Sequence, residues 1–396
     1  MKQSDKVLYA KFRIYLGITV MLSFLIYPTA CNKNKNISNP QVIIKLPDQR
    51  NGEFHLENYV DSTIYVKLET SDDCLIQRIN RISVFENKIY IHDSKMKSVI
   101  VFDLKGIFLF KIQKVGMGPE EYNDITSFCI DGINKNIVIH DISKNSIYKY
   151  CAYNGKFKEV VRIKERKSFA RDILMIDNGE YLCYSNEYPG QAFCGIWLLN
   201  EKGDFKKHLW KQTKVYPVTP IDPSPMLLKE INDGVYSIFD VINNIIYHYD
   251  GLKLIKAYQF DFSQNTVSTL SDYPGITNMK RFNDKIVDII DIAAIQETSN
   301  YIWTTWLCNQ VATQTFYIKK DDKLIMAKKT HLIDGIMGNM KPTNNRDIIC
   351  FEIGAWECAD LLKNDKNNQI AAVVKSLISK TNPLDNPIIQ ILYMKK

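Results

Sequence analysis

The sequence has none of the short motifs that mark the common hydrolases and nucleotide-binding proteins. It contains no Gly-x-Ser-x-Gly, no His-Glu-x-x-His and no Cys-x-x-Cys, and no glycine-rich run ends in the Lys-Ser or Lys-Thr of a phosphate-binding loop. These absences leave serine catalysis, zinc-peptidase chemistry and P-loop nucleotide binding without support. We therefore predict no catalytic residues, no metal ligands and no cofactor.

The chain also lacks a strong charge bias. Of its 396 residues, 51 are basic and 44 are acidic, which gives a formal charge of +7. The first 31 positions hold four of the basic residues and one acidic residue, so the remainder carries only +4. The lysines are scattered and do not alternate with aromatic residues, as they would on a surface that follows a phosphate backbone. We predict no nucleic-acid partner.

A hydrophobic run long enough to span a membrane is missing as well. The apolar segment 14–27 has 14 residues, or about 21 Å as a helix, which is short of the roughly 30 Å hydrocarbon core. It follows a basic stretch that ends at Arg13 and precedes Thr29-Ala30-Cys31, which resembles a bacterial lipobox. We predict that residues 1–31 are a lipoprotein signal segment and that Cys31 is lipidated, with cleavage after Ala30 as the alternative.

The residues after Cys31 carry no apolar pattern at first, and we predict a flexible tether over residues 32–58. The tether has no acidic cluster of the kind that would resemble a surface-export signal. The predicted localisation is therefore export, with lipid anchoring to the bacterial cell envelope on the periplasm-facing side. The membrane is the first predicted partner.

Cysteine usage does not indicate a disulfide framework. Eight cysteines follow Cys31, and most lie inside apolar runs, so we interpret them as small buried hydrophobic residues. Cys183 and Cys194 are the one pair placed to bridge a single hairpin.

Glycines at regular intervals indicate an internal repeat. Gly106, Gly155, Gly203 and Gly251 are separated by 49, 48 and 48 residues. Each unit holds about four short runs of β-branched and aromatic residues bounded by Gly, Asn and Asp, which is typical of a four-stranded antiparallel sheet. Two less regular copies follow, and the last is interrupted by a helical segment near residues 369–379.

One such sheet cannot bury both of its faces, whereas radial stacking around an axis buries them and leaves only short edges. We predict an all-β fold over residues 59–396, a six-bladed β-propeller with four-stranded antiparallel blades. The last blade lacks one strand at the C-terminus, and an N-terminal strand at residues 64–68 is free to complete it. The predicted ring closes in this way.

The sequence also resembles a known family, the six-bladed β-propeller lipoproteins of Bacteroides-type bacteria, which are relatives of NHL-repeat propellers. The resemblance covers residues 60–393 and implies the fold, export and anchoring, but no agreed activity. It rests on five short segments: Leu68-Glu69-Thr70, residues 89–93, the turn at residues 102–106, the Gly-x-Gly-Pro-x-Glu-Tyr run at residues 116–122, and Asp385-Asn386-Pro387.

The run at residues 116–122 is the candidate ligand contact. It connects two predicted blades, so it crosses one face of the ring. Its candidate residues are Gly116, Gly118, Pro119, Glu121 and Tyr122, which combine two flexible positions, a stiff turn, an acceptor and an aromatic donor. The alternative is a structural loop that braces neighbouring blades.

Two further patterns involve ionisable residues. His92-Asp93 and His140-Asp141 occupy equivalent repeat positions, but strand alternation sends His and Asp to opposite faces, so we interpret the aspartates as turn residues. Carboxylates from different blades can still meet at a propeller axis; the ones near inner strands are Asp172, Asp177 and Asp233.

Three functions are compatible with these observations. The first is a non-catalytic binding or scaffolding module for an envelope protein, a peptide or a glycan. The second is an NHL-like or lactonase-like propeller hydrolase or lyase with an axial metal or carboxylate site. The third, a partner of a nutrient-uptake complex, rests on fold analogy alone.

Overall fold

The structure is a computed structural model. It describes residues 39–46, 52–165, 170–185, 194–211, 228–240, 243–261, 291–308, 311–365 and 368–396. The predicted signal segment with Cys31 lies outside these residues. Within them, no helix is both long enough and apolar enough to cross a bilayer.

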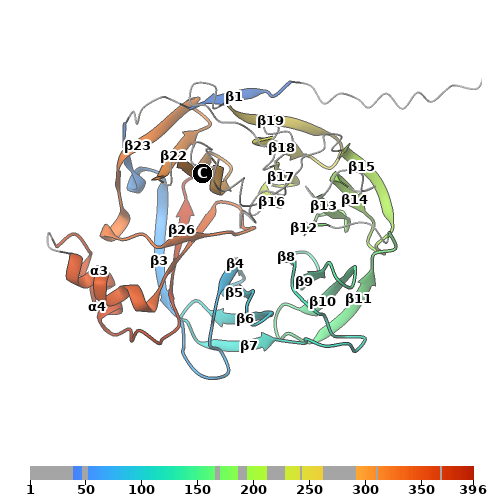
Figure 1. Cartoon of the computed structure of the whole chain (residues 1–396), viewed down its shortest axis with the longest axis horizontal. Helices are drawn as coiled ribbons and strands as arrows, with labels where there is room; N and C mark the ends of the chain where they lie inside the picture. The colour runs from blue at the N-terminus through green and yellow to red at the C-terminus, as the bar shows by residue number, and fades with distance from the viewer. Residues whose placement is uncertain are drawn as a thin grey trace, which may run out of the picture. The chain divides into compact units, whose positions relative to one another are not determined.

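Most strands belong to five blades, each built from four consecutive strands that run from the central axis to the rim (Figure 1). The innermost strands are β4 (Ile79–Phe85), β8 (Ser127–Asp131), β12 (Asp172–Met175), β16 (Leu228–Asn232) and β20 (Asp291–Glu297). The second strands are β5 (Lys88–Asp93), β9 (Asn136–Asp141), β13 (Tyr181–Ser185), β17 (Val235–Asp240) and β21 (Tyr301–Cys308). The third strands are β6 (Ser98–Asp103), β10 (Ser146–Cys151), β14 (Gly195–Leu199), β18 (Ile245–Tyr249) and β22 (Val311–Ile318). The outermost strands are β7 (Phe108–Ile112), β11 (Phe157–Arg162), β15 (Phe205–Lys211), β19 (Leu254–Asp261) and β23 (Lys323–His331).

A composite sheet joins the two ends of the chain. It contains β24 (Asn339–Lys341), β25 (Ile348–Ile353), β26 (Ile388–Met394) and the N-terminal strand β3 (Val60–Lys67). β26 and β3 pair in antiparallel register, with Ile388 opposite Lys67 and Ile391 opposite Ile64.

Two more N-terminal strands cover the outer edges of blades. β1 (Val42–Lys45) pairs in parallel with β19, and β2 (Gly52–His55) pairs in parallel with β23, so these two sheets have five strands each. Figure 1 shows β1 along the rim of its blade. The added strands occupy backbone groups that would otherwise form open sheet edges.

The all-β propeller architecture is confirmed, but the prediction of six four-stranded antiparallel blades is wrong. Five blades come from consecutive strands, and the remaining sheet is a composite whose inner strand has only three residues. Two blades gain a fifth, parallel strand. The repeat pattern marks only the antiparallel four-strand unit, and the short added strands carry no repeat of their own.

The added strands also correct the predicted tether. Residues 42–45 and 52–55 lie within the segment expected to be flexible, yet both pair with blades, and Phe54 and Leu56 are fully buried. A short 3-10 helix, η1 (Leu56–Asn58), connects β2 to β3. The ordered part of the chain therefore begins well before residue 59.

The repeat glycines confirm tight turns at the predicted positions. All four have positive φ, at 86°, 67°, 79° and 85° for Gly106, Gly155, Gly203 and Gly251. A Cβ atom on Gly203 would lie 2.6 Å from the carbonyl oxygen of Arg162 in β11, and one on Gly155 would lie 2.7 Å from the Phe110 ring in β7. Glycine is needed both for the backbone conformation and for close approach to the preceding blade.

Apolar side chains between neighbouring blades form the core. One cluster joins the first blade to the second and includes Tyr90, Val99, Phe128 and Ile139, all buried. The cysteines behave as predicted: Cys74, Cys129, Cys183, Cys194, Cys350 and Cys358 are buried and free. Cys183 and Cys194 therefore do not bridge the hairpin.

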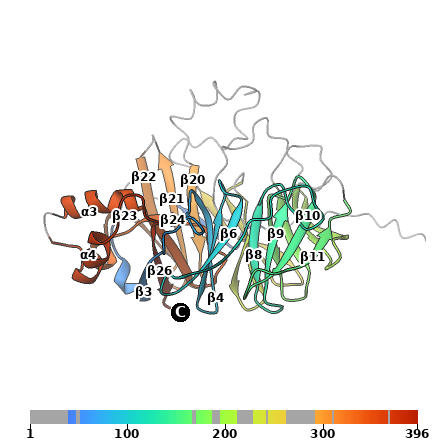
Figure 2. The same ribbon diagram turned by 90° about the horizontal axis from the view of Figure 1, so that it is seen from below.

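The helices lie outside the sheets, beyond β3 (Figure 2). The predicted helical segment is α4 (Ala372–Ser379), and α3 (Cys358–Asn364) precedes it. Two 3-10 helices, η4 (Ile333–Gly335) and η5 (Ala355–Glu357), complete this region. Val374 and Ile378 anchor α4 in a small apolar cluster with Ile353 and Ile388 of the composite sheet.

Candidate functional site

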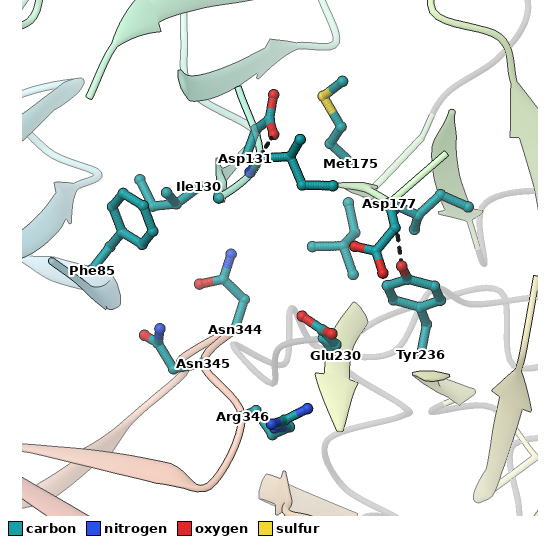
Figure 3. A pocket seen from close by; sticks show the side chains of 14 residues that line it. Phe85, Ile130, Asp131, Met175, Asp177, Glu230, Tyr236, Asn344, Asn345 and Arg346 are labelled. Atoms are coloured by element: carbon teal, nitrogen blue, oxygen red, sulfur yellow. Dashed lines mark hydrogen bonds between the residues drawn. The ribbon is translucent and has the colours of Figure 1, made fainter. Parts of the chain in front are cut away.

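A cavity of about 420 Å³ lies where the innermost strands of four blades end. Turns that join the first and second strands of these blades line it, together with the loop between β24 and β25. The lining residues are Phe85, Ile130, Asp131, Gly132, Ile133, Leu174, Met175, Ile176, Asp177, Glu230, Tyr236, Asn344, Asn345 and Arg346. Figure 3 shows Asn344 and Asn345 on one side of the cavity and Asp177 and Tyr236 on the other.

The loop at residues 342–347 is held in place by the first blade. The Ile82 amide donates to the carbonyl oxygen of Pro342 at 2.9 Å. The Asn345 side chain both accepts from the Val84 amide and donates to the Val84 carbonyl, each at 2.6 Å. The Ser83 hydroxyl donates to Asn344. These contacts fix the loop across the mouth of the cavity.

Asp131 and Asn345 serve the structure of the cavity wall. Asp131 accepts hydrogen bonds from the amides of Ile133 and Asn134 and from the Asn136 side chain, so it stabilises its own turn. The side chain of Asn345 is hydrogen-bonded to Val84 and Thr343. The polar groups that remain directed at the cavity are those of Asp177, Glu230, Arg346 and the Asn344 amide.

Glu230 and Asp177 form a carboxylate pair. Burial, and next the charge of Asp177, raise the pKa of Glu230 above its usual value, while Arg346 opposes the shift. The Asp177 amide donates to the Tyr236 hydroxyl oxygen at 3.0 Å, which links the two turns. A carboxyl group with a raised pKa exchanges a proton more readily near neutral pH than an exposed one.

Arg346 supplies the positive charge. It pairs with Asp233, whose side chain is 95% exposed, and its Nε lies 3.9 Å from Asp347. Its own side chain is 31% exposed. The guanidinium is therefore held between the turn of the β16 blade and its own loop, and part of it faces solvent.

Arg81 and Asp172 bridge the channel at the other end of the innermost strands. Arg81 donates two hydrogen bonds to Asp172 and a third to the carbonyl oxygen of Phe128. The Leu228 amide also donates to Asp172. Residues of four blades thus contact one ion pair. The pair lies near the start of the innermost strands, whereas the cavity lies where these strands end.

The predicted ligand residues of the 116–122 loop do not line this cavity. The loop precedes β8, whereas the cavity lies where β8 ends. Lys144 donates to the carbonyl oxygens of Gly116 and Glu121, and Glu121 accepts from the Gly118 amide at 2.7 Å. Tyr122 is fully buried, and its hydroxyl donates to the carbonyl oxygen of Lys97. These contacts match the structural alternative.

The repeated His-Asp pairs also have structural roles. Asp93 accepts from the amides of Gln77, Lys95 and Met96, which confirms the turn interpretation. Asp141 accepts from Asn123 and Ser143 in the same way. His92 and His140 are each only 1% exposed, and the His92 ring lies edge-on to Phe128 of the next blade.

Another buried ionic group joins the β16 and β20 blades. Glu297 lies 2.6 Å from Lys319 and 2.9 Å from His248. Although burial opposes ionisation, Lys319 and His248 hold the pKa of Glu297 below its usual range. Because its carboxylate is occupied by these partners, we assign it to blade packing.

Sequence reasoning found part of this site. Asp177 and Asp233 were among the carboxylates expected near inner strands, and Asp172 was the third. Glu230, Asn344 and Arg346 were missed. The signal that could have found Glu230 is its repeat position, just before the turn between the first two strands of a blade.

Antiparallel blades around an axis, with a cavity at the ends of the innermost strands, define a β-propeller with a candidate axial site. The chain belongs to the family described as Domain of unknown function (DUF4934), whose sequence model matches residues 41–393. No curated protein matches the chain.

Among solved structures, the chain is similar to a protein of Bacteroides fragilis that is regarded as exported. The identity is 17% and the TM-score 0.68, over 90% of this chain and all of the other. A member of the DUF4221 family from Bacteroides vulgatus is 9% identical, with a TM-score of 0.49, over 85% of this chain and 97% of the other. The likeness to the Bacteroides fragilis protein shows a shared fold.

Proposed function

We propose that this protein is a non-catalytic binding module and that its axial cavity binds a small polyhydroxyl ligand, such as a free sugar or the end of a glycan. The observation that carries the proposal is the convergence of Asp177, Glu230, Asn344 and Arg346 from three separate sheets on one cavity. Hydrogen-bonding groups set among apolar walls are typical of small-molecule sites.

The charge of the site favours a neutral ligand. Asp131, Asp177 and Glu230 carry potential negative charge, and Arg346, already paired with Asp233, is the cation of the lining. An anionic ligand would meet net repulsion. Carboxylate, amide and guanidinium groups together match hydroxyls, which both donate and accept hydrogen bonds.

The test is a glycan array, followed by titration calorimetry with the strongest ligand. Glu230→Gln and Arg346→Ala should each weaken binding at least tenfold, because each removes a charged hydrogen-bonding partner. Glu121→Ala, a carboxylate change outside the cavity, is the matched control and should bind as the unaltered protein does. Unchanged binding by both cavity variants would overturn the proposal.

We also propose that the module is exported and held at a bacterial membrane through lipidated Cys31, facing the periplasm. The support is the basic and apolar leader that ends in Thr29-Ala30-Cys31. Metabolic labelling with a fatty-acid analogue tests this proposal. We expect label in the unaltered protein and none in Cys31→Ala.

The second candidate function is hydrolysis or elimination of the bound glycan. It is favoured by the raised pKa of Glu230 beside Asp177, since glycosidases use a protonated and an ionised carboxyl group together. Product analysis after long incubation distinguishes the two. Turnover that Glu230→Gln abolishes would establish the enzyme, and an unchanged ligand supports the binding module.

A further inference from the structure

Two histidines far apart in the sequence meet where the N-terminal strand β2 joins β23. The rings of His55 and His331 stack with their centroids 3.9 Å apart and an angle of 4° between their planes. The Glu53 Oε2 atom lies 2.8 Å from Nε2 of His331 and 3.8 Å from Nε2 of His55. Both Nε2 atoms thus face the same carboxylate oxygen.

The neighbouring Glu57 decides which His55 nitrogen carries a proton. Glu57 Oε1 lies 3.1 Å from His55 Nδ1. An ionised carboxylate can only accept, so Nδ1 is the protonated nitrogen of a neutral His55. The Nε2 lone pair then faces Glu53 Oε2, which is also an acceptor. Two acceptor atoms directed at one position offer two ligands to a cation placed there.

We propose that Glu53, His55 and His331 bind one divalent metal ion, with zinc as the preferred ion. Imidazole nitrogen and carboxylate oxygen are established zinc ligands, and their three ligand atoms lie within 4.8 Å of one another. Ligand atoms of a tetrahedral site stand about 3.3 Å apart for bonds of about 2.0 Å. Because a metal ion lies in the plane of each imidazole ring, the two stacked rings must tilt toward one another to bind the same ion. Water takes the fourth position, because the three side chains are 29% to 58% exposed.

Glu57 is a positioning residue in this site. Metal-bound histidines usually donate their other ring N–H to a carboxylate, which fixes the tautomer and the ring orientation. The contact of Glu57 with His55 Nδ1 has this geometry before any metal is bound.

The metal would join segments 276 residues apart. His55 ends β2 and His331 ends β23, and the two residues are opposite each other in the parallel register. A bound ion therefore fastens the N-terminal strand to the rim of the β20 blade. This strand lies in the segment that leads from the predicted anchor at Cys31 to the propeller.

The test uses the full chain without an affinity tag, stripped with a chelator and titrated with zinc chloride at pH 7.5. We expect one-to-one binding at micromolar zinc, and a visible absorption band of a tetrahedral complex when cobalt replaces zinc. His55→Ala and His331→Ala should abolish both signals. Glu57→Gln should weaken binding by about 10- to 100-fold.

Folding and nonspecific binding are controlled separately. Glu86→Gln, an exposed carboxylate in another blade, should bind zinc as the unaltered protein does. Hydrogen exchange at the β2 amides should slow on zinc addition, except in Glu53→Gln. Zinc binding should also weaken when the solution is acidified, because protons compete with the metal for its ligands. Zinc binding retained by His331→Ala, or none in the unaltered protein, would overturn the proposal.

Discussion

Arg81 and Asp172 form a two-hydrogen-bond ion pair across the central channel, with both side chains almost fully buried. The two residues are 91 positions apart and belong to blades that are not neighbours, β4–β7 and β12–β15. Since Phe128 and Leu228 supply further hydrogen bonds, the pair ties four innermost strands to one point.

Breaking this pair should destabilise the ring strongly. Arg81→Met removes the cation that faces the buried Asp172 carboxylate, for which we expect a loss of about 3–5 kcal/mol in the free energy of unfolding. Adding Asp172→Leu should restore part of the loss, because it removes the uncompensated charge. Urea unfolding measures both. The exposed pair Lys135–Glu86 is the control, and its loss should change the free energy of unfolding far less. An effect of Arg81→Met no larger than that of the control would contradict the assignment.

Acid should destabilise the protein through two buried histidines. Burial lowers the pKa of His92 to about 3 and that of His140 to about 4, and among the described residues their ring nitrogens have no hydrogen-bond partner. An unfolded histidine binds a proton below about 6.5, so the unfolded state binds more protons than the native state between pH 6.5 and 4. Stability therefore falls as the pH falls through this window.

The measurement is urea unfolding at pH 7 and pH 5. Each histidine should contribute about 2 kcal/mol to the difference between these two pH values. The double variant His92→Leu with His140→Leu should lose the histidine contribution to this pH dependence. The contributions of the other titratable groups should remain. A pH dependence that stays the same in the double variant would show that these histidines are protonated in the native state.

The 116–122 loop should affect stability and leave ligand binding unchanged. Tyr122→Phe removes the hydrogen bond to Lys97 and should cost about 1 kcal/mol. Tyr122→Ala also removes a buried ring and should cost about 3–5 kcal/mol. Thermal unfolding and calorimetry with the cavity ligand check the two effects separately. Lost binding in Tyr122→Phe with unchanged stability would return this loop to a ligand role.

The N-terminal strands should be part of the folded unit. Phe54 packs against Trp303 and Phe316, and its removal in Phe54→Ala should cost about 3–5 kcal/mol. Ile43→Ala, at an exposed position of β1, is the control and should cost less than about 1 kcal/mol. Deletion of residues 1–58 should lower the melting temperature far more than deletion of residues 1–40. Equal melting temperatures for the two truncations would show that β1 and β2 are dispensable.

Local repeats made the blades predictable from the sequence. Gly106, Gly155, Gly203 and Gly251 occupy one turn in four successive blades, and each turn needs the same backbone conformation. The composite sheet and the added strands were harder, because β1, β2 and β24 have three or four residues each and no repeat partner. The positions of β1 and β2 are determined by the outer strands with which they pair, β19 and β23.

The candidate site is formed by residues that are far apart in the sequence, so their spacing along the chain does not predict that they meet. Asp177 and Arg346 are 169 positions apart, and His55 and His331 are 276 positions apart. Only the ring brings either pair together. Residues 116–122 form a compact motif in the sequence, which suggested a ligand contact. In the structure the motif is a loop with internal hydrogen bonds and two further hydrogen bonds from Lys144.

The most direct test of the central claim is a crystal structure of the protein with the strongest ligand from the glycan array. The account predicts the ligand in the axial cavity, with hydrogen bonds to Glu230 and Arg346 and contact with the walls around Tyr236 and Met175. A ligand bound at the face that carries the 116–122 loop, with the axial cavity occupied by solvent, would contradict the account.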